Sequence, residues 1–276
     1  MNNFKTFGLM AILTLLLMVL GGAIGGQYGA IIALVLAGVG NFVSYWFSDK
    51  MVLKAYRAQE LPADHKITRM VSQLASKANL PMPKVYIINQ DQPNAFATGR
   101  NPENAAVAVT RGLVNSMNDN ELSGVLAHEL GHIANRDILI GTVAATLAGA
   151  ITYLGYASRF GMGGRDNRQS NPLFLLLALI LAPLAASLIR MAISRTREYK
   201  ADAFGAGVSG NPLYLSSALS RLENWAKQIP LKGNEATSHM FIVHPFRGGG
   251  FSRLFSTHPS TVDRIRRLNE LAGKRS

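Results

Sequence analysis

Long apolar stretches dominate the pattern of hydrophobic and polar positions along this chain. Residues 6–48, 138–158 and 169–189 contain no Asp, Glu, Lys or Arg. A helix needs ~20 apolar residues to cross the hydrocarbon core of a bilayer. The first stretch is long enough for two such helices, and Gly25, Gly26 and Gln27 divide it. We therefore expect a membrane-spanning helical hairpin over residues 1–48.

The basic residues beside this hairpin predict its orientation. Lys5 precedes the first apolar segment, and Lys50, Lys54 and Arg57 follow the second. Because basic residues concentrate on the cytoplasmic side of a membrane, both ends of the hairpin are expected in the cytoplasm. A cleavable signal peptide is the alternative interpretation of Lys5 and the apolar segment behind it, but a second apolar segment follows with no soluble domain in between.

The stretches at 138–158 and 169–189 are open to two interpretations. Their length favours two further membrane spans. Pro183 interrupts the second stretch, and three arginines lie between the two. The alternative is a pair of buried helices packed against the soluble part. In either case residues 138–193 separate two polar parts of the chain, 49–137 and 194–276.

The two polar parts predict a small, mainly helical α+β domain. Apolar positions at helical spacing and capping residues predict helices over residues 64–80, 118–132, 195–205, 211–229 and 257–271. Short apolar runs beside Pro and Gly predict strands over residues 84–88, 93–99 and 105–110. Residues 231–256 show no clear period.

Composition narrows the possible chemistry. The chain has 276 residues, of which 48% are hydrophobic and 16% charged, and it contains no cysteine. Disulfides and thiol catalysis are therefore excluded, and a bound metal must use His and carboxylate ligands. The net charge of +12 suits either nucleic acid or a membrane protein with cationic loops. The basic residues at 264–275 lack interleaved aromatic residues, which favours a membrane-facing or solvated face over nucleic-acid binding.

The sequence HELGH at residues 128–132 is the strongest chemical signal. On a helix, His128 and His132 lie on one face, so both imidazoles can bind one zinc ion. Glu129 stands beside them and can act as general base. A helix with two incidental histidines is the alternative, but the neighbouring apolar residues bury one side of this helix, and an unpartnered histidine pair would carry a desolvation cost.

A catalytic zinc ion takes three protein ligands and keeps one position open. Asp137 is a poor third ligand because it lies about 140° round the helix from His132. Glu198 and Asp202 are four residues apart and share a helix face. One can bind zinc while the other orients a ligand histidine, and a solvated acidic pair is the alternative. His65, His239 and His244 are expected not to bind zinc, since a fourth protein ligand would close the site.

Four motifs occur in a characteristic order: PNAFAT at 93–98, HELGH at 128–132, SRTREYKAD at 194–202, and THPS at 257–260 followed by Arg264 and Ile265. With the hairpin, they make the whole chain resemble the HtpX family of membrane-bound zinc metalloproteases. That family is of the gluzincin type and is related to the prenyl-protein CAAX endopeptidases. The resemblance implies a zincin-like metallopeptidase domain interrupted by apolar helices in a multi-pass membrane protein.

The resemblance also assigns roles to residues. His128, His132 and Glu198 would bind one Zn²⁺ per chain, Glu129 would be the catalytic base and acid, and Asp202 would orient a ligand histidine. Asn94 would lie at an edge strand that receives the substrate backbone. His258 would stabilise the oxyanion or only brace a helix.

The implied function is cleavage of unfolded or misfolded membrane proteins on the cytosolic side of the inner membrane. The family works under stress beside an ATP-dependent membrane protease system, and the partners expected are substrate protein and lipid bilayer, with no nucleic acid. The zinc helix ends just before the stretch at 138–158, which predicts a site close to the bilayer. Processing of lipidated peptides and a non-catalytic membrane scaffold with a zinc site are the alternatives.

Overall fold

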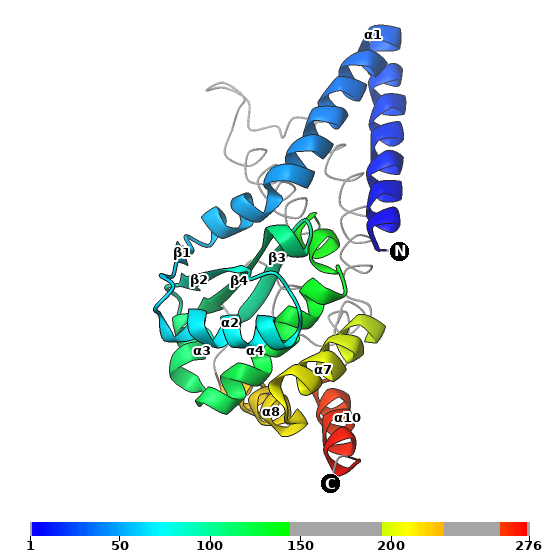
Figure 1. Ribbon diagram of the computed structural model, residues 1–276. Helices are drawn as coiled ribbons and strands as arrows, with labels where there is room; N and C mark the ends of the chain where they lie inside the picture. Colours follow the sequence, from blue (N-terminus) through cyan, green and yellow to red (C-terminus); the bar gives the residue numbers. More distant parts are fainter. Residues whose placement is uncertain (1, 144–194, 229–259, 275–276) are drawn as a thin grey trace.

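The N-terminal helix folds back on itself as a hairpin. The structure is a computed structural model, and it describes residues 2–143, 195–228 and 260–274. Helix α1 (Asn2–Ala55) loses helical geometry at Gly25 and Gly26, where its two arms meet (Figure 1). Asn41 on the second arm donates a hydrogen bond of 2.9 Å to Thr14 on the first. The turn therefore lies where the sequence predicts it.

A small mixed sheet forms the centre of the domain below the hairpin. Its strands are β1 (Gln59–Glu60), β2 (Lys84–Ile88), β3 (Ala95–Gly99) and β4 (Ala105–Thr110). Their spatial order is β1-β2-β4-β3, with β2 parallel to β4 and the other two pairs antiparallel. A 3₁₀ turn at Pro102–Asn104 connects β3 to β4. Strand β3 is thus an edge strand of the described sheet.

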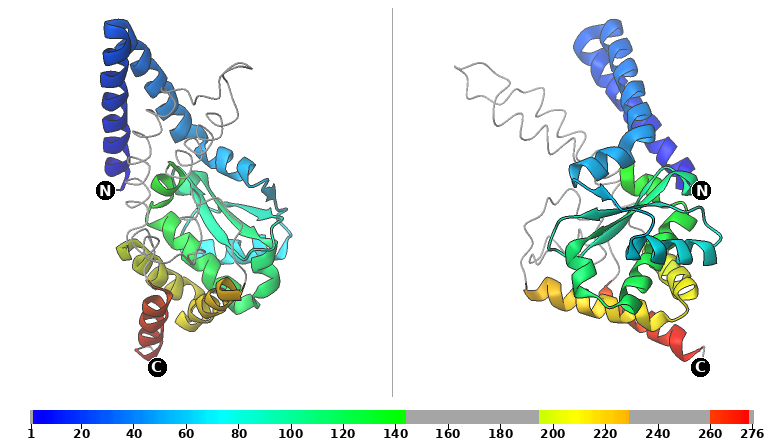
Figure 2. Two further views of the ribbon diagram at one scale, coloured as in Figure 1. Left: turned by 180° about the vertical axis from the view of Figure 1, so that it is seen from behind. Right: turned by 60° about the vertical axis from the view of Figure 1, so that its left-hand side comes forward.

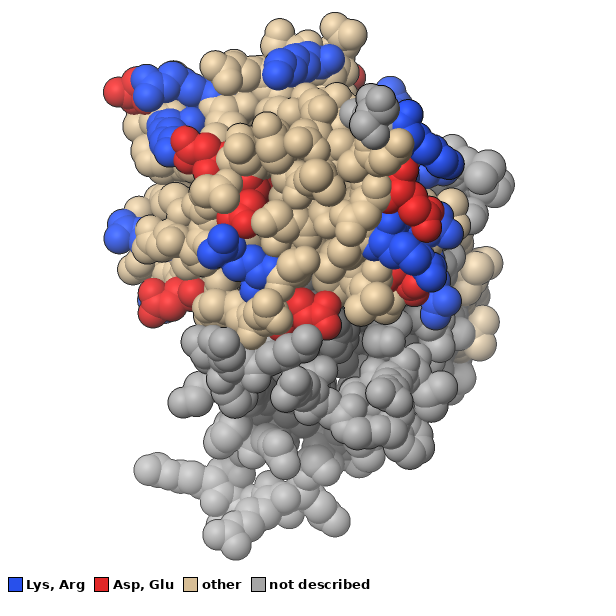
Figure 3. Space-filling view, turned by 90° about the horizontal axis from the view of Figure 1, so that it is seen from below, with Lys and Arg blue, Asp and Glu red and all other residues tan. Residues whose placement is uncertain are grey.

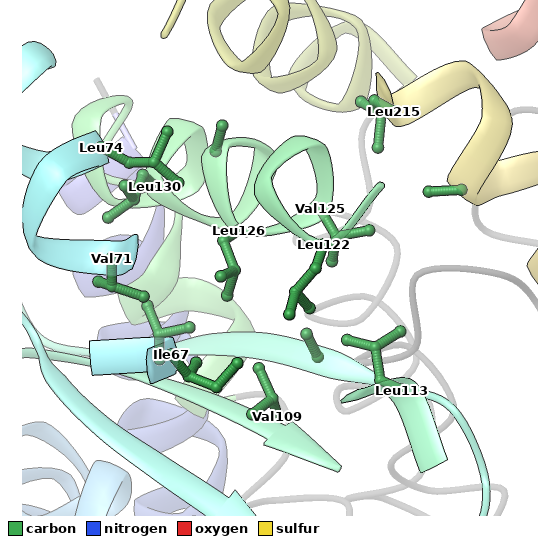
Figure 4. Close-up of a cluster of buried hydrophobic side chains, with 14 of the residues drawn as sticks. Ile67, Val71, Leu74, Val109, Leu113, Leu122, Val125, Leu126, Leu130 and Leu215 are labelled. Atoms are coloured by element: carbon green, nitrogen blue, oxygen red, sulfur yellow. The ribbon is translucent and has the colours of Figure 1, made fainter. Parts of the chain in front are cut away.

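The two faces of the sheet have different partners. On one face, α2 (Lys66–Lys77), α3 (Arg111–Ser116) and α4 (Asp119–Ala134) bury the main apolar core (Figure 4). Alternate strand residues such as Val107 and Val109 point into this core, as the period of two requires. On the other face, Val52 and Leu53 at the end of α1 pack against Phe96. The hairpin is therefore joined directly to the sheet.

Three further helices lie at the end of the domain away from the hairpin (Figure 2); the first two pack on α4, and the third packs on those two. They are α7 (Arg195–Ser209), α8 (Pro212–Gln228) and α10 (Thr261–Gly273). Helix α8 is tied to the start of α4, because Ser217 and Arg221 donate hydrogen bonds to Glu121. Glu121 also completes the capping box of α4 with Asn118. Helix α4 is thus enclosed by the sheet on one side and helices on the other.

The structure confirms a mainly helical α+β fold with a small mixed sheet. The predicted strands at 84–88 and 105–110 have the observed bounds, and β3 begins two residues after the predicted start. Strand β1 and helix α3 were not predicted. Helix α10 begins at Thr261 rather than at residue 257, because Ser260 is its N-cap. Residues 231–256 lie outside the described residues.

Among the described residues, the helix segment Gly25–Ala55 is long and apolar enough to cross a membrane. Only 6% of its most apolar 18-residue stretch is buried inside the protein. The shorter arm contains a second apolar helix, Met10–Val19. Of the two later apolar stretches, the structure describes only residues 138–143, which are helical. The prediction that these stretches span the membrane therefore lies almost wholly outside the described residues.

Candidate metal centre

The histidines of α4 are held in the interior of the domain. Helix α4 runs between the sheet and the later helices, and His128 and Glu129 are only 2% and 4% exposed. His132 follows one turn later on the same face, so the two rings meet edge to face. Their Nε2 atoms lie 3.2 Å apart. The helical spacing alone thus brings two nitrogen donors to one point.

Glu198 of α7 adds an oxygen to this pair. Its carboxylate oxygens lie 3.8 Å from Nε2 of His128 and 3.5 Å from Nε2 of His132. Ligand atoms bound tetrahedrally at about 2.1 Å from a zinc ion lie about 3.4 Å apart. Among the described residues, these three side chains form a group whose ligand atoms all lie within 4.8 Å of one another, close enough to bind one metal ion. Both the donor atoms and their spacing therefore fit zinc.

Asp202 lies one turn after Glu198 and contacts the far side of His128. Its Oδ1 is 2.9 Å from Nδ1 of His128. A carboxylate in this position fixes the tautomer in which Nε2 carries the lone pair for a metal. Burial alone would raise the pKa of Asp202, but the nearby Arg264 and His128 outweigh that effect and lower it to about 2. Asp202 is therefore ionised at neutral pH.

A second carboxylate, that of Asp137, lies near His132. Oδ2 of Asp137 lies 3.7 Å from Nδ1 of His132, and Arg197 of α7 lies 3.5 Å from the other oxygen of Asp137. Burial would lower the pKa of His132, but Asp137, Glu198 and Glu129 raise it to about 9. Asp137 lies behind the histidine and is not among the three converging donors.

Glu129 faces the edge strand rather than the three donors. The backbone N–H of Ala97 in β3 donates a hydrogen bond of 2.8 Å to its Oε2. Burial raises the pKa of Glu129, and the neighbouring His128 and His132 oppose that rise. A carboxyl group whose pKa is raised toward neutrality is suited to exchanging protons in a reaction.

The hydrogen-bond pattern of β3 shows which of its backbone groups face outward. The Thr110 amide donates to the Asn94 carbonyl at 2.9 Å, so residues 94 and 110 form a hydrogen-bonded pair. By the alternation of an antiparallel ladder, the N–H and C=O groups of Ala95, Ala97 and Gly99 point away from β4. Asn94 immediately precedes this edge and is 3% exposed. His258, His239 and His244 lie outside the described residues, and His65 caps α2.

Comparison with known proteins agrees with this geometry. The model of peptidase family M48 matches residues 63–272. The chain belongs to peptidase family M48. Its relatives include protease HtpX homologs of Syntrophotalea carbinolica, 53% identical over 98% of this chain and 99% of the relative, and of Methylibium petroleiphilum, 54% identical over 99% of both. Protease HtpX of Legionella pneumophila is 50% identical over 98% of this chain and 99% of its own.

A solved structure shows the same fold. The crystal structure of S. mikatae Ste24p matches 96% of this chain and 66% of its own, with a TM-score of 0.54 and 18% identity. The resemblance to the HtpX family is therefore confirmed. The His-x-x-x-His pattern with a glutamate from a later helix is the zinc site typical of M48 peptidases. The chain is accordingly a zinc metallopeptidase, and it is a membrane protein with at least one predicted transmembrane helix.

Arg264 lies buried at the metal centre, which the sequence pattern does not predict. It was assigned to a membrane-facing or solvated basic face, but it is 1% exposed. From α10 it donates two hydrogen bonds to Asp202, of 2.9 and 2.7 Å, and one of its nitrogens lies 3.5 Å from Glu198. The ion pair compensates its burial. One signal was available, since Arg264 lies four residues before the fully buried Leu268 on the same helix face.

Close packing between α4 and α7 brings the acidic residues to the histidines. A methyl group at Gly205 would lie 2.9 Å from the backbone nitrogen of His128, and one at Gly131 would lie 3.0 Å from Ala201. Real Cβ atoms essentially never come as close to backbone as at Gly205, and at Gly131 the neighbour would have to shift by a few tenths of an ångström, so both glycines favour the approach of the two helices. The separation between Glu198 and the histidines therefore depends on positions that carry no chemistry.

We expect Gly205→Ala to weaken zinc binding. The added methyl group must push α7 away from His128, which costs about 1–3 kcal/mol and moves Glu198 and Asp202 together. Zinc affinity can be measured by competition with a chromogenic chelator. Gly273→Ala is the matched control, because nothing lies within 4 Å of a methyl group there. Equal zinc affinity in both variants would contradict the packing argument.

Proposed function

We propose that this M48 protein is an endopeptidase in which His128, His132 and Glu198 hold one zinc ion and Glu129 transfers protons. When bound, zinc would polarise the scissile carbonyl and lower the pKa of a water molecule toward ~7. Glu129 takes a proton from the attacking water and delivers it to the leaving nitrogen. The observation that carries this proposal is that the carboxylate of Glu129, next to His128 in the group of three converging donors, bonds to an outward backbone N–H of the edge strand.

The outward backbone groups of β3 support a mode of substrate binding. A peptide that pairs with Ala95 and with the carbonyl of Ala97, whose N–H bonds to Glu129, is held by main-chain hydrogen bonds, which read no particular sequence. Asn94 would contact the substrate at the start of this edge. His258 would stabilise the oxyanion or brace the C-terminal helix. Such binding suits a protease that must accept many unfolded segments.

The membrane hairpin supports a substrate class and a location. We assign the natural substrates to misfolded or damaged membrane proteins, cut on the cytosolic side of the inner membrane. In this assignment the chain is multi-pass, with its catalytic domain in the cytoplasm, and it acts under stress beside an ATP-dependent membrane protease. The face opposite the hairpin carries acidic and basic side chains interspersed among neutral ones (Figure 3). No single-sign basic surface for nucleic acid gathers on the described residues of that face.

The proposal is tested by metal dependence of hydrolysis. Detergent-purified full-length protein is stripped of metal, and cleavage of an unfolded model protein is compared before and after addition of one zinc ion per chain. We expect cleavage only in the zinc-loaded sample. If zinc binds and neither sample cuts, the unfolded-protein assignment fails; a prenylated peptide then separates lipidated-peptide processing from a non-catalytic scaffold. If zinc does not bind, the ligand assignment is wrong.

A further inference from the structure

The end of the edge strand β3 lies against the membrane hairpin. Arg100, the residue after β3, places its guanidinium 4.4 Å from the centre of the Trp46 ring on α1. Trp46 stands between Tyr45 and Phe47, just before the first charges after the apolar stretch, Asp49 and Lys50. Tryptophan and tyrosine gather at the level of the lipid headgroups. One end of the strand edge is therefore held at the membrane surface.

The other end of β3 lies further from the bilayer along the same helix. Phe96 packs with Val52 and Leu53, and its ring centre is 5.4 Å from that of Tyr56. From Trp46 to Leu53 the helix rises about 10 Å. Strand β3 therefore runs toward the membrane beside the end of α1, with Phe96 on the cytosolic side and Arg100 at the surface.

A second set of contacts fixes the same junction. Gly99 donates its outward N–H to Thr142 at 3.3 Å, and the hydroxyls of Thr98 and Thr142 are 2.9 Å apart. Thr142 belongs to helical residues 138–143, whose Leu139 and Val143 pack against Met10 of the hairpin. The outward donor of Gly99 is thus occupied. The outward N–H of Ala97 is held by Glu129, so a substrate strand can follow β3 along Ala95 and the carbonyl of Ala97 but must leave the edge before the membrane.

The reacting position on this strand is marked by Glu129, which bonds to Ala97. Ala97 is three residues from Arg100, and extended chain covers about 3.3 Å per residue, or about 10 Å in all. A peptide anchored in the bilayer needs at least about three residues to span this gap, and more where its path goes around Thr142. The sheet packs directly against the hairpin through apolar side chains. The fold itself therefore sets the distance from the reacting position to the membrane surface.

We infer that this protein cleaves juxtamembrane segments, beginning about three residues from the end of a transmembrane helix, and that Arg100 is a positioning residue for this distance. The inference rests on the proposed endopeptidase function and adds the part of the substrate that reaches the site. This positional restriction is distinct from the higher cutting rate that attachment of enzyme and substrate to the same membrane would give. Attachment alone would raise the cutting rate along a whole tail, whereas a fixed site restricts where the cuts fall.

The test is a map of cleavage positions. Zinc-loaded full-length protein in liposomes is given a single-span reporter whose unstructured cytosolic tail repeats one cleavable unit, and the products are identified by mass spectrometry. The same tail without the span, added in detergent, is the companion substrate. We expect cuts in the tethered tail only in the units next to the span and cuts throughout the free tail. Even cutting of both tails would overturn the inference and leave the endopeptidase standing. If neither tail is cut, the proposed function fails, and this inference with it.

Arg100 is tested by the same map. In Arg100→Ala the contact with Trp46 is lost while those of Phe96 and Thr142 remain, so the strand end should loosen and the cuts should spread outward by about one residue. Hydrolysis of the free tail should stay unchanged, which also shows that the variant is folded. Arg111→Ala, at an exposed position on α3, is the matched control and should keep the wild-type map. A wild-type map for Arg100→Ala would overturn the role assigned to this residue.

Discussion

Glu129→Gln is expected to lower the rate of peptide hydrolysis by about 10²- to 10⁴-fold, the range for loss of a general acid–base group. The amide cannot take a proton from the attacking water. It can still accept the hydrogen bond that Ala97 donates to Oε2 of Glu129. The three donors on His128, His132 and Glu198 are unchanged, so zinc should remain bound. The variant thus separates proton transfer from assembly of the site.

The measurement pairs kcat/KM on an unfolded protein with zinc content of the same sample. Glu103→Gln, on the exposed 3₁₀ turn after β3, is the matched control and should resemble the wild type. Hydrolysis by Glu129→Gln at the wild-type rate would remove Glu129 from the reaction. Loss of zinc from Glu129→Gln would show that Glu129 acts by supporting the site and would leave its role as a base without support.

The centre of the site is predictable from the sequence because its spacing is local. His128 and His132, like Glu198 and Asp202, are four residues apart, and helix geometry alone sets their faces. The pairing of α4 with α7 is not local, since it depends on the close approach at Gly205 and Gly131. Spacing therefore shows which groups share a helix face, and tertiary packing determines which faces meet.

The basic residues near the C-terminus do not share one environment, although their sequence pattern predicts a single exposed basic face. Arg264, Arg266 and Arg267 form one basic run in the sequence. In the structure, Arg264 is buried and donates hydrogen bonds to Asp202. Arg266 pairs with Asp263 at the surface. The guanidinium carbon of Arg267 lies 3.9 Å from the ring centre of Tyr199. Strand β1, with two residues, and helix α3, with six, are too short for any period to reveal them. These features depend on contacts with distant parts of the chain.

The largest expected loss of stability comes from Arg264→Met. Methionine fills similar space but leaves the carboxylate of Asp202 buried without its cation. Removing one partner of a buried ion pair typically costs about 3–5 kcal/mol. Asp202 would also cease to hold His128 in place, and loss of such support typically weakens metal binding about 10- to 100-fold. Arg264→Lys should lie between, since lysine keeps the charge but cannot form the two-nitrogen contact.

Arg266→Met provides the control on the same helix. Its side chain is 64% exposed and pairs with Asp263 three residues earlier, and exposed pairs of this kind contribute little. Unfolding in denaturant and zinc affinity by chelator competition are measured for both variants. If Arg264→Met unfolds and binds zinc as Arg266→Met does, Arg264 does not stabilise the site.

The pH dependence of this loss has a defined sign. In the folded wild type the pKa of Asp202 is about 2, below its ordinary value of 3.8. Its ionised form therefore stabilises the fold above about pH 4, and this contribution disappears as the pH falls through about 2. In Arg264→Met the burial of Asp202 is no longer opposed by that cation, so its pKa rises. The difference in free energy of unfolding between the metal-free proteins should accordingly be largest near neutral pH and shrink in acid. A difference that stays constant from pH 7 to about pH 2 would show that Arg264 acts by packing and not through the charge of Asp202.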